Sequence, residues 1–532
     1  MVGNYLSVVL LAFLFTIPLS YILVWRFKIA VEKRINSHQD FQSPQREIFY
    51  IQPKVSAPEL KVIPLKNGKN PKNPFLYFFP FFLSAFVLSV FIALTIYWIN
   101  PDDFSWLNSS ILFLFMMSPV FLIGFLFSNY SAFYRNRILK LGAFFYAMIL
   151  VFAVFISDKL NLFDAVFGLF FIFGLVPLLF FLLYLFRSIQ SIVFVVFPAI
   201  FIAISTLTFL ANDFQGNEES VRVVFNFLYE ILKLFGWVDF TRFVLYFMVL
   251  LFVGILAILF SGIVRSQYRN KRYNNFLFLT DMIWISQITY VILSFQEIPF
   301  QILVIPVLFF LYKLVFWIGL NLFHSDKKEN KRLLVLRVFS LGRKSEKFFQ
   351  KLKNFWAYNG SIQLISGYDL TTSIMDIDDL LVFYSGQIKN RFNLSNSLIQ
   401  QNISKLDFKT DFDRRFRINK MYSNNSTWKT VLHELIDRTD YALMDIRNFH
   451  RKNAGCAYEI QALVHFIPLE KTCFIINEST DVSFVQEIVE SAWKEIPIDS
   501  PNASNPQPIR LFKIGNQTDF DTVSAYLELE LG

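Results

Sequence analysis

The chain has 532 residues, a net charge of +9 and a hydrophobic content of 55%, with 67 phenylalanines. A mean hydropathy of +0.45, together with apolar runs of about 20 residues, excludes an ordinary soluble globular protein. Five histidines and two cysteines, without the spacing of a CxxC or HExxH motif, give no reason to expect a metal site.

The first part of the chain, residues 1–324, is predicted to be a polytopic α-helical membrane domain of about nine spans. Its apolar runs reach the length of about 20 residues that crosses the hydrocarbon core of a bilayer. One further stretch, 221–240, carries four charged residues. We therefore expect it to form an amphipathic helix on the membrane surface rather than a tenth span. The predicted spans are 5–25, 75–99, 106–129, 141–157, 163–186, 189–211, 243–264, 275–295 and 300–323.

Lysine and arginine are concentrated in alternate loops of this domain. The loop at 26–73 and the loops after the third, fifth, seventh and ninth spans are basic, whereas the intervening loops are poor in positive charge. Because basic loops stay on the cytoplasmic side, we expect the N-terminus outside and the C-terminal domain in the cytoplasm. The expected location is a bacterial inner membrane. The net charge then reflects topology in the lipid bilayer, and no nucleic-acid partner is expected.

The cytoplasmic loop at 26–73 contains a segment in which apolar and polar residues alternate. This segment, 47–66, is interrupted by Pro53, Pro58 and Pro64, and proline disfavours a central strand. We therefore expect an extended arm that can dock on the C-terminal domain.

One charged residue lies in the middle of a predicted span. Lys313 belongs to the last span, and a charge at this depth is costly unless it is compensated. Two interpretations stay open. Lys313 either reaches the interface or pairs with Asp281, or it is a pore- or lipid-facing switch residue.

A basic linker at 325–332 leads into residues 333–532, where short apolar runs alternate with amphipathic helices. This alternation predicts a cytoplasmic α/β domain with a mostly parallel sheet and helices on both faces. Ligands of such sheets bind beyond the carboxyl ends of the strands. The polar segment 392–425 is predicted to be an insertion. No GxGxxG or GxxxxGK[ST] motif is present, so a standard phosphate loop is not expected.

The predicted insertion carries a basic cluster. Arg414, Arg415 and Arg417 lie close together in the sequence. They either form a solvated face or meet the membrane surface or a nucleotide phosphate.

The order of elements in residues 333–480 resembles that of a Toll/interleukin-1 receptor (TIR) domain. The first predicted strand ends in VFS (338–340), which is similar to the VFISY-type strand of that family. The later sequence GCAYEI matches the family signature W-C-x-x-E-[LI] at Cys456, Glu459 and Ile460. The resemblance implies a TIR/flavodoxin-like fold. It also implies Glu459 as the candidate catalytic residue, because the glutamate of this signature cleaves the nicotinamide–ribose bond of NAD in TIR enzymes.

Candidate ligand contacts lie at the predicted carboxyl ends of the strands. Asp445 and Arg447 straddle one strand end, where they form either a structural ion pair or part of a ligand crevice. Asp369 follows another strand and is either a turn residue or a ligand contact. Glu459 is alternatively an ordinary helix carboxylate. The candidate ligand-binding residues are Phe339, Ser340, Asp369, Asp445, Arg447 and Cys456.

The two parts of the chain together suggest three functions. The first is a membrane-anchored signalling or defence protein whose TIR-like domain binds a nucleotide-type ligand or self-associates into a homo-oligomer. The second is an enzyme that hydrolyses NAD with Glu459. The third is a channel or transporter regulated by the α/β domain. An open pocket at Glu459 would favour the enzyme, and a closed crevice would favour an interaction module.

Overall fold

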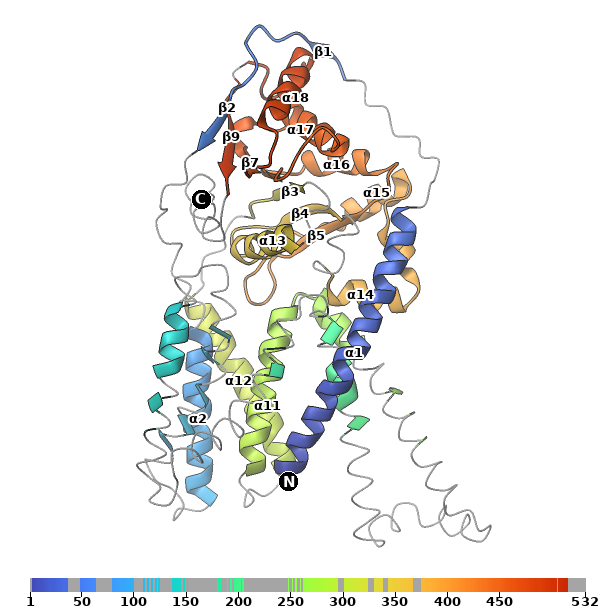
Figure 1. The fold of residues 1–532 in the computed structure, drawn as a ribbon. Helices are drawn as coiled ribbons and strands as arrows, with labels where there is room; N and C mark the ends of the chain where they lie inside the picture. The colour runs from blue at the N-terminus through green and yellow to red at the C-terminus, as the bar shows by residue number, and fades with distance from the viewer. Residues whose placement is uncertain are drawn as a thin grey trace, which may run out of the picture.

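The computed structural model describes most of the α/β part of the chain and pieces of the helical part. The described residues are 2–36, 48–63, 79–99, 262–294, 301–323, 330–337, 343–366, 375–504 and 506–514, with short pieces between 109 and 259. Apolar helices gather at one end of the molecule and the α/β domain lies at the other (Figure 1). The long apolar helices are α1 (Val2–Ile35), α2 (Phe79–Ile99), α11 (Asn275–Ser294) and α12 (Gln301–Phe323).

Among the described residues, two helices are long and apolar enough to cross a membrane, Ser7–Ile35 and Val304–Leu322. The prediction of about nine spans is therefore wrong. A third apolar helix, Phe79–Thr95, is shorter. The predicted amphipathic helix at 221–240 lies outside the described residues. The same is true, wholly or in large part, of the predicted spans at 141–157, 163–186, 189–211 and 243–264.

Helix α11 shows why hydropathy overestimates the number of spans. This helix occupies the predicted span at 275–295, yet Asp281 is only 5% exposed and Gln287 only 2%. Trp284 and Ile288 are fully buried in the same helix. An apolar helix that packs inside protein has the same composition as one that faces lipid, so the sequence pattern alone does not separate the two.

The α/β domain is built on a seven-stranded sheet in which all neighbouring strands are parallel. This confirms the predicted α/β domain. The order along the sheet is β2-β9-β7-β6-β3-β4-β5. Strand β3 is buried at all five positions, as expected for a parallel strand covered on both faces. The strands are β2 (Leu60–Ile63), β3 (Leu333–Arg337), β4 (Ile362–Ser366), β5 (Ile418–Tyr422), β6 (Tyr441–Asp445), β7 (Thr472–Ile476) and β9 (Ile509–Lys513).

The strands that follow residue 330 have the order 3-2-1-4-5-6, which is the doubly wound, Rossmann-type order. The flavodoxin-like order implied by the TIR resemblance is 2-1-3-4-5. The difference is strand β5, which comes from the predicted insertion at 392–425 and pairs along its full length with β4. This segment therefore extends the sheet by one edge strand. In both orders successive strands are added first on one side of β3 and then on the other, so the change of side lies between β3 and β6.

Helices cover both faces of the sheet (Figure 1). On one face α13 (Arg343–Trp356) packs over Leu333, Val335 and Leu364. The other face, which includes Leu334 and Leu336, is covered by α16 (Trp428–Ile436), α17 (Ala454–Phe466) and α18 (Val482–Lys494). The remaining helical elements of the domain are α14 (Ile377–Tyr384), η5 (Gln387–Arg391), α15 (Asn396–Ile403) and η6 (Leu469–Lys471).

The predicted arm docks on the α/β domain through its described residues, 48–63. Strand β2 pairs in parallel with β9 and forms an edge of the sheet. Upstream of it, β1 (Tyr50–Ile51) pairs antiparallel with β8 (Ile496–Pro497). The indole Nε1 of Trp493 donates a hydrogen bond of 2.8 Å to the Val55 carbonyl. A loop between two apolar helices therefore completes the sheet.

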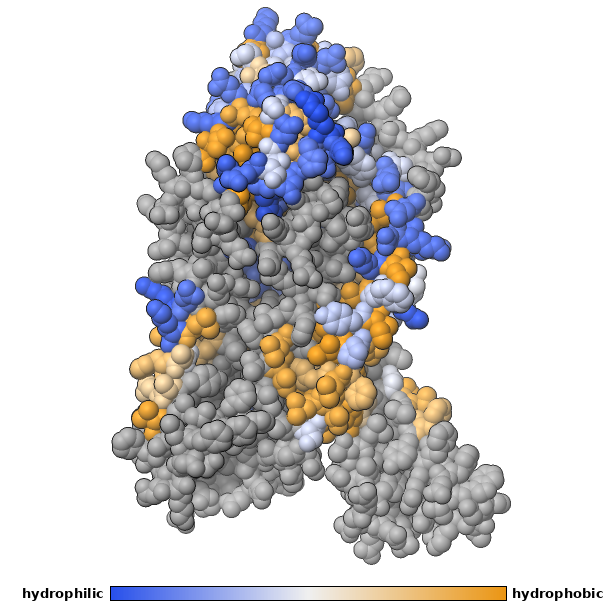
Figure 2. All heavy atoms as spheres, viewed as in Figure 1, coloured by the Kyte–Doolittle hydropathy of each residue, from blue (hydrophilic) through white to orange (hydrophobic). Residues whose placement is uncertain are grey.

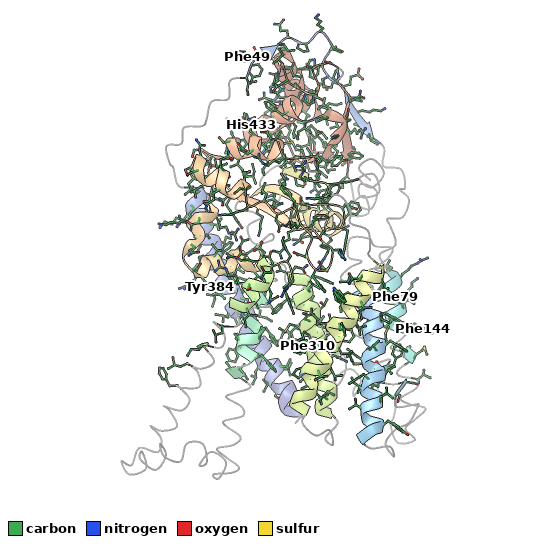
Figure 3. The ribbon with its side chains drawn as sticks, turned by 180° about the vertical axis from the view of Figure 1, so that it is seen from behind. Phe49, Phe79, Phe144, Phe310, Tyr384 and His433 are labelled. Atoms are coloured by element: carbon green, nitrogen blue, oxygen red, sulfur yellow. The ribbon has the colours of Figure 1, made fainter. Side chains whose placement is uncertain are left out.

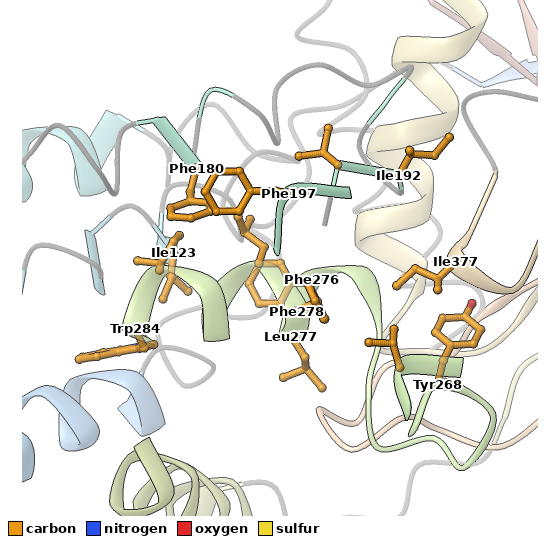
Figure 4. Packing of buried hydrophobic residues seen from close by; sticks show 14 of the residues in the cluster. Ile123, Phe180, Ile192, Phe197, Tyr268, Phe276, Leu277, Phe278, Trp284 and Ile377 are labelled. Carbon is orange, nitrogen blue, oxygen red and sulfur yellow. The ribbon is translucent and has the colours of Figure 1, made fainter. Parts of the chain in front are cut away.

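The apolar helices and the α/β domain share a hydrophobic cluster. At about 1.5 Å per residue, α1 is about 50 Å long, which exceeds the ~30 Å core of a bilayer. Phe27 and Val31 near its carboxyl end are fully buried in this cluster, and the rings of Phe27 and Phe383 are 5.5 Å apart. The cluster continues from α11 to Ile377 of α14 (Figure 4). The two parts are thus joined by packing as well as by the chain.

We expect Trp493→Phe to loosen the arm, because phenylalanine cannot donate to the Val55 carbonyl. The free energy of unfolding should fall by about 0.5–1.5 kcal/mol, and protease cleavage within 48–63 should become faster. The matched control is Trp356→Phe, which removes a similar bond of 3.2 Å to the Lys331 carbonyl. It should lower stability without exposing the arm. Equal cleavage rates in the two variants would contradict this role.

Candidate functional site

The carboxyl ends of β3 and β6 form the point at which the chain reverses its direction along the sheet. The last residues of the two strands, Arg337 and Asp445, are register partners. Strand β3 leads toward α13 on one face, and β6 leads toward α17 on the other. In open α/β sheets the crevice at such a switch point is where ligands bind. Both strand ends carry charged side chains, and both side chains are buried.

Asp445 and Arg447 form a bidentate ion pair at this point. The Arg447 Nε donates to Asp445 Oδ1 at 2.8 Å and Nη2 donates to Oδ2 at 2.6 Å. The guanidinium lies 4.9 Å from the ring centroid of Phe348 in α13. Asp445 and Arg447 therefore form the structural ion pair that was one of the two predicted alternatives. The pair lies at the strand end, where the ligand crevice is also predicted. No described residue bonds Arg447 Nη1, which leaves this group available to a ligand.

The segment of the TIR resemblance forms the first turns of α17. Cys456 donates its thiol proton to the Arg337 carbonyl, with an S···O distance of 3.6 Å, which holds this end of α17 against β3. Glu459 lies one turn further on and is only 4% exposed. Its Oε2 has no hydrogen-bond partner among the described residues. An unpartnered buried carboxyl oxygen is costly and rare in native proteins, which marks Glu459 as a functional candidate.

Burial raises the pKa of Glu459 to about 8 because a carboxylate is poorly stabilised away from water. The Cys456 thiol and the Arg337 guanidinium offset part of this rise. At neutral pH the group is therefore mostly a neutral acid that can donate one hydrogen bond. The Glu459 side chain is itself enclosed rather than open to solvent, which favours a binding module over an enzyme.

Three sequence-predicted candidates, Phe339, Ser340 and Asp369, lie outside the described residues. The structure brings Asp445, Arg447, Cys456 and Glu459 together at the switch point. Sequence reasoning missed Arg337 as a member of this group. The available signal was a single arginine that ends an otherwise apolar strand.

The intramembrane candidate Lys313 forms an ion pair with Asp281. Its Nζ lies 2.7 Å from Asp281 Oδ2 and 3.0 Å from Oδ1. Tyr273 and Tyr312 also donate their hydroxyls to this carboxylate. Of the two interpretations of Lys313, pairing with Asp281 is thus confirmed, and the cluster satisfies a charge that a lone lysine would leave uncompensated.

The basic cluster of the predicted insertion lies at the junction with the helical part. Arg417 Nε donates to Asp411 at 2.7 Å, and its Nη2 donates to the carbonyls of Tyr268 and Tyr273 at 2.6 and 3.0 Å. Arg415 pairs with Asp413. These two arginines are therefore held by protein partners and do not form a solvated face.

Comparison with models of protein families, with curated proteins and with solved structures finds no match for this chain. The site is therefore interpreted from its own geometry. It combines the buried Arg337, the half-buried Arg447, which has a guanidinium nitrogen free of described partners, and one neutral carboxyl. Such a set can hold a phosphate or another oxyanion and donate a hydrogen bond to a neighbouring hydroxyl or base.

Glu459→Gln tests the neutral state of this carboxyl. In the wild type the unfolded chain loses the proton above its ordinary pKa of 4.5 and the folded chain loses it near 8. Folding stability should therefore fall between these two pH values, by up to about 5 kcal/mol. Glutamine does not titrate, so the variant lacks this decline. Denaturant unfolding of the full chain in detergent at pH 5 and pH 8 measures this change in stability for both proteins.

The matched control is Glu490→Gln, which replaces an exposed carboxyl on α18. Its stability should follow the wild type at both pH values. A wild type and a Glu459→Gln variant that lose stability in parallel as the pH rises would contradict the neutral state.

Proposed function

We propose that this protein is a membrane-anchored signalling protein whose α/β domain binds a nucleotide-type ligand at the switch point of its sheet. The observation that supports this most directly is the grouping of Arg337, Arg447 and Glu459 at the carboxyl ends of β3 and β6. Arginine nitrogens suit the phosphates of a nucleotide, and a neutral carboxyl suits a ribose hydroxyl or a base. Asp445 fixes the orientation of Arg447, so the site is organised before a ligand arrives.

The exposed side chains of α1 and α12 support embedding in a lipid bilayer. Leu14 is 67% exposed on α1, and Phe310 is 72% exposed on α12. Exposed apolar surface on this scale is typical of contact with a partner or a membrane. Figure 2 shows that hydrophobic side chains dominate the described surface at the helical end, and Figure 3 places Phe310 there.

The basic residues of α1 support an orientation. Lys33 and Arg34 lie in its last turn, at the end that packs against α14. Helix α12 also directs its carboxyl end toward the α/β domain, because Arg414 bonds Asn321 at 3.2 Å. By the positive-inside rule, the proposal places the α/β domain in the cytoplasm and the N-terminus outside, with a bacterial inner membrane as the location.

The alternative of NAD hydrolysis is less well supported. Cleavage of the nicotinamide–ribose bond develops positive charge on the ribose, which an ionised carboxylate stabilises. Glu459 is mostly neutral at pH 7, because burial raises its pKa to about 8. Ligand binding without turnover fits this state better. Self-association of the α/β domain remains a prediction of the sequence resemblance.

Arg447→Gln tests the proposed nucleotide site. The full chain in detergent should bind NAD or ATP saturably in calorimetry. The variant should weaken this binding about tenfold or more, because a charge-assisted bond to phosphate contributes about 1.5–3 kcal/mol. Nicotinamide release in the same samples should stay at background for the wild type and for Glu459→Gln.

The matched control is Arg438→Gln. Arg438 is also paired with a carboxylate, Glu434, but it lies before β6, at the opposite end of the strands. It should leave nucleotide binding unchanged. Absence of saturable binding in the wild type, or an equal loss in both variants, would refute the proposed site. If the wild type releases nicotinamide and Glu459→Gln does not, the result would support NAD hydrolysis instead of ligand binding.

A further inference from the structure

A cavity of about 120 Å³ lies where the α/β domain meets the helical part. Its walls come from the second half of α13, the start of β4, residues 375–376 before α14, β5 with residues between 411 and 417 before it, and Tyr268 with residues 274–276 at the start of α11. This place is toward the amino ends of the strands, whereas the candidate nucleotide site is at the carboxyl ends of β3 and β6. The two sites are therefore separate.

The described wall of this cavity carries more positive than negative side chains. The four cations are Lys353, Arg415, Arg417 and Lys420, and the two carboxylates are Asp376 and Asp411. Two further carboxylates that balance the cluster, Asp379 and Asp413, do not line the cavity. The interior of the cavity thus faces an excess of positive charge.

Three of the four cations already have carboxylate partners. Lys420 Nζ lies 2.6 Å from Asp376 and also contacts Asp379. Arg417 lies 2.7 Å from Asp411. Arg415 donates to Asp413 at 2.6 Å. The charges of these three cations are therefore compensated within the protein. The fourth cation, Lys353, differs from them.

Lys353 lies in the last turn of α13 and has no hydrogen bond or ion pair with any described residue. Burial, together with the neighbouring charges of Lys420 and Arg415, lowers the pKa of Lys353 to about 8. Asp376 opposes this shift. Lys353 is half-buried, and a partly desolvated cation without a partner is unfavourable, so an anion in the cavity would reduce that cost.

We propose that this cavity binds a small phosphate-bearing anion, with Lys353 as its principal ligand. The volume accommodates several water molecules or one tetrahedral oxyanion. Lysine acts on phosphate as a point charge, and the Asn354 amide and the Tyr268 hydroxyl, which also line the cavity, supply further donors. Because the walls belong to both parts of the molecule, the anion joins the α/β domain to residues 268–276.

Inorganic phosphate is the probe, and the full chain in a nonionic detergent is the sample. Calorimetry should show saturable phosphate binding to the wild type, weakened about tenfold or more in Lys353→Gln. Lys353→Arg keeps the charge and should retain binding, and a retained circular-dichroism spectrum shows that each variant folds. Lys351→Gln on the same helix is the matched control and should bind as the wild type does.

Arg447→Gln separates this site from the nucleotide site, since it should leave the Lys353-dependent phosphate binding intact. A wild type without saturable phosphate binding, or a Lys353→Gln variant that binds phosphate as tightly as the wild type, would overturn the proposal. Nanodiscs distinguish the source of the anion. Loss of free-phosphate binding in phosphatidic acid discs, but not in phosphatidylcholine discs, supports the site with a lipid headgroup as its occupant. Retention in both supports it with a soluble anion.

Discussion

The Arg417 guanidinium joins the two parts of this molecule. It stacks at 3.7 Å on the Tyr268 ring and donates to two carbonyls of the segment that precedes α11. Asp411 compensates its charge, so the partly buried arginine is tolerated. Asn274 extends this joint, because its Oδ1 caps the first turn of α11 while its Nδ2 donates to Asp411 and Asp413. The start of α11 is thereby fixed to the edge of the sheet domain.

The α/β domain could be predicted from sequence because its signals are local. Strand β3 is a continuous apolar run, and α13 begins soon after it with apolar residues on one face. The strand order could not be predicted fully, because β5 comes from a polar segment whose pairing with β4 depends on neighbours distant in sequence. The predicted number of spans was wrong for the opposite reason. An apolar run such as α11 records burial but does not say whether lipid or protein provides it.

The candidate site was only partly accessible to sequence reasoning. Asp445, Arg447 and Glu459 could be found because charged residues at strand ends and in a signature-like helix stand out. Arg337 was missed since its importance comes from its register with Asp445, which is a property of the sheet. Lys353 gave no signal at all. Its sequence context is an ordinary amphipathic helix, and only packing against the β4–β5 edge and residues 268–276 makes its charge unusual.

Strand β2 has a consequence for how the protein is made. The arm that carries it is synthesised long before β9, its partner, so this pairing cannot form until translation has passed β9. During that interval β2 has only its own short segment, and a four-residue strand is not stable alone. A C-terminal fragment cut at the linker would meet the same difficulty permanently. The unpaired N–H and C=O groups of β9 would be available to strands of other copies. The α/β domain therefore depends on a segment from between two apolar helices to cover this edge of its sheet.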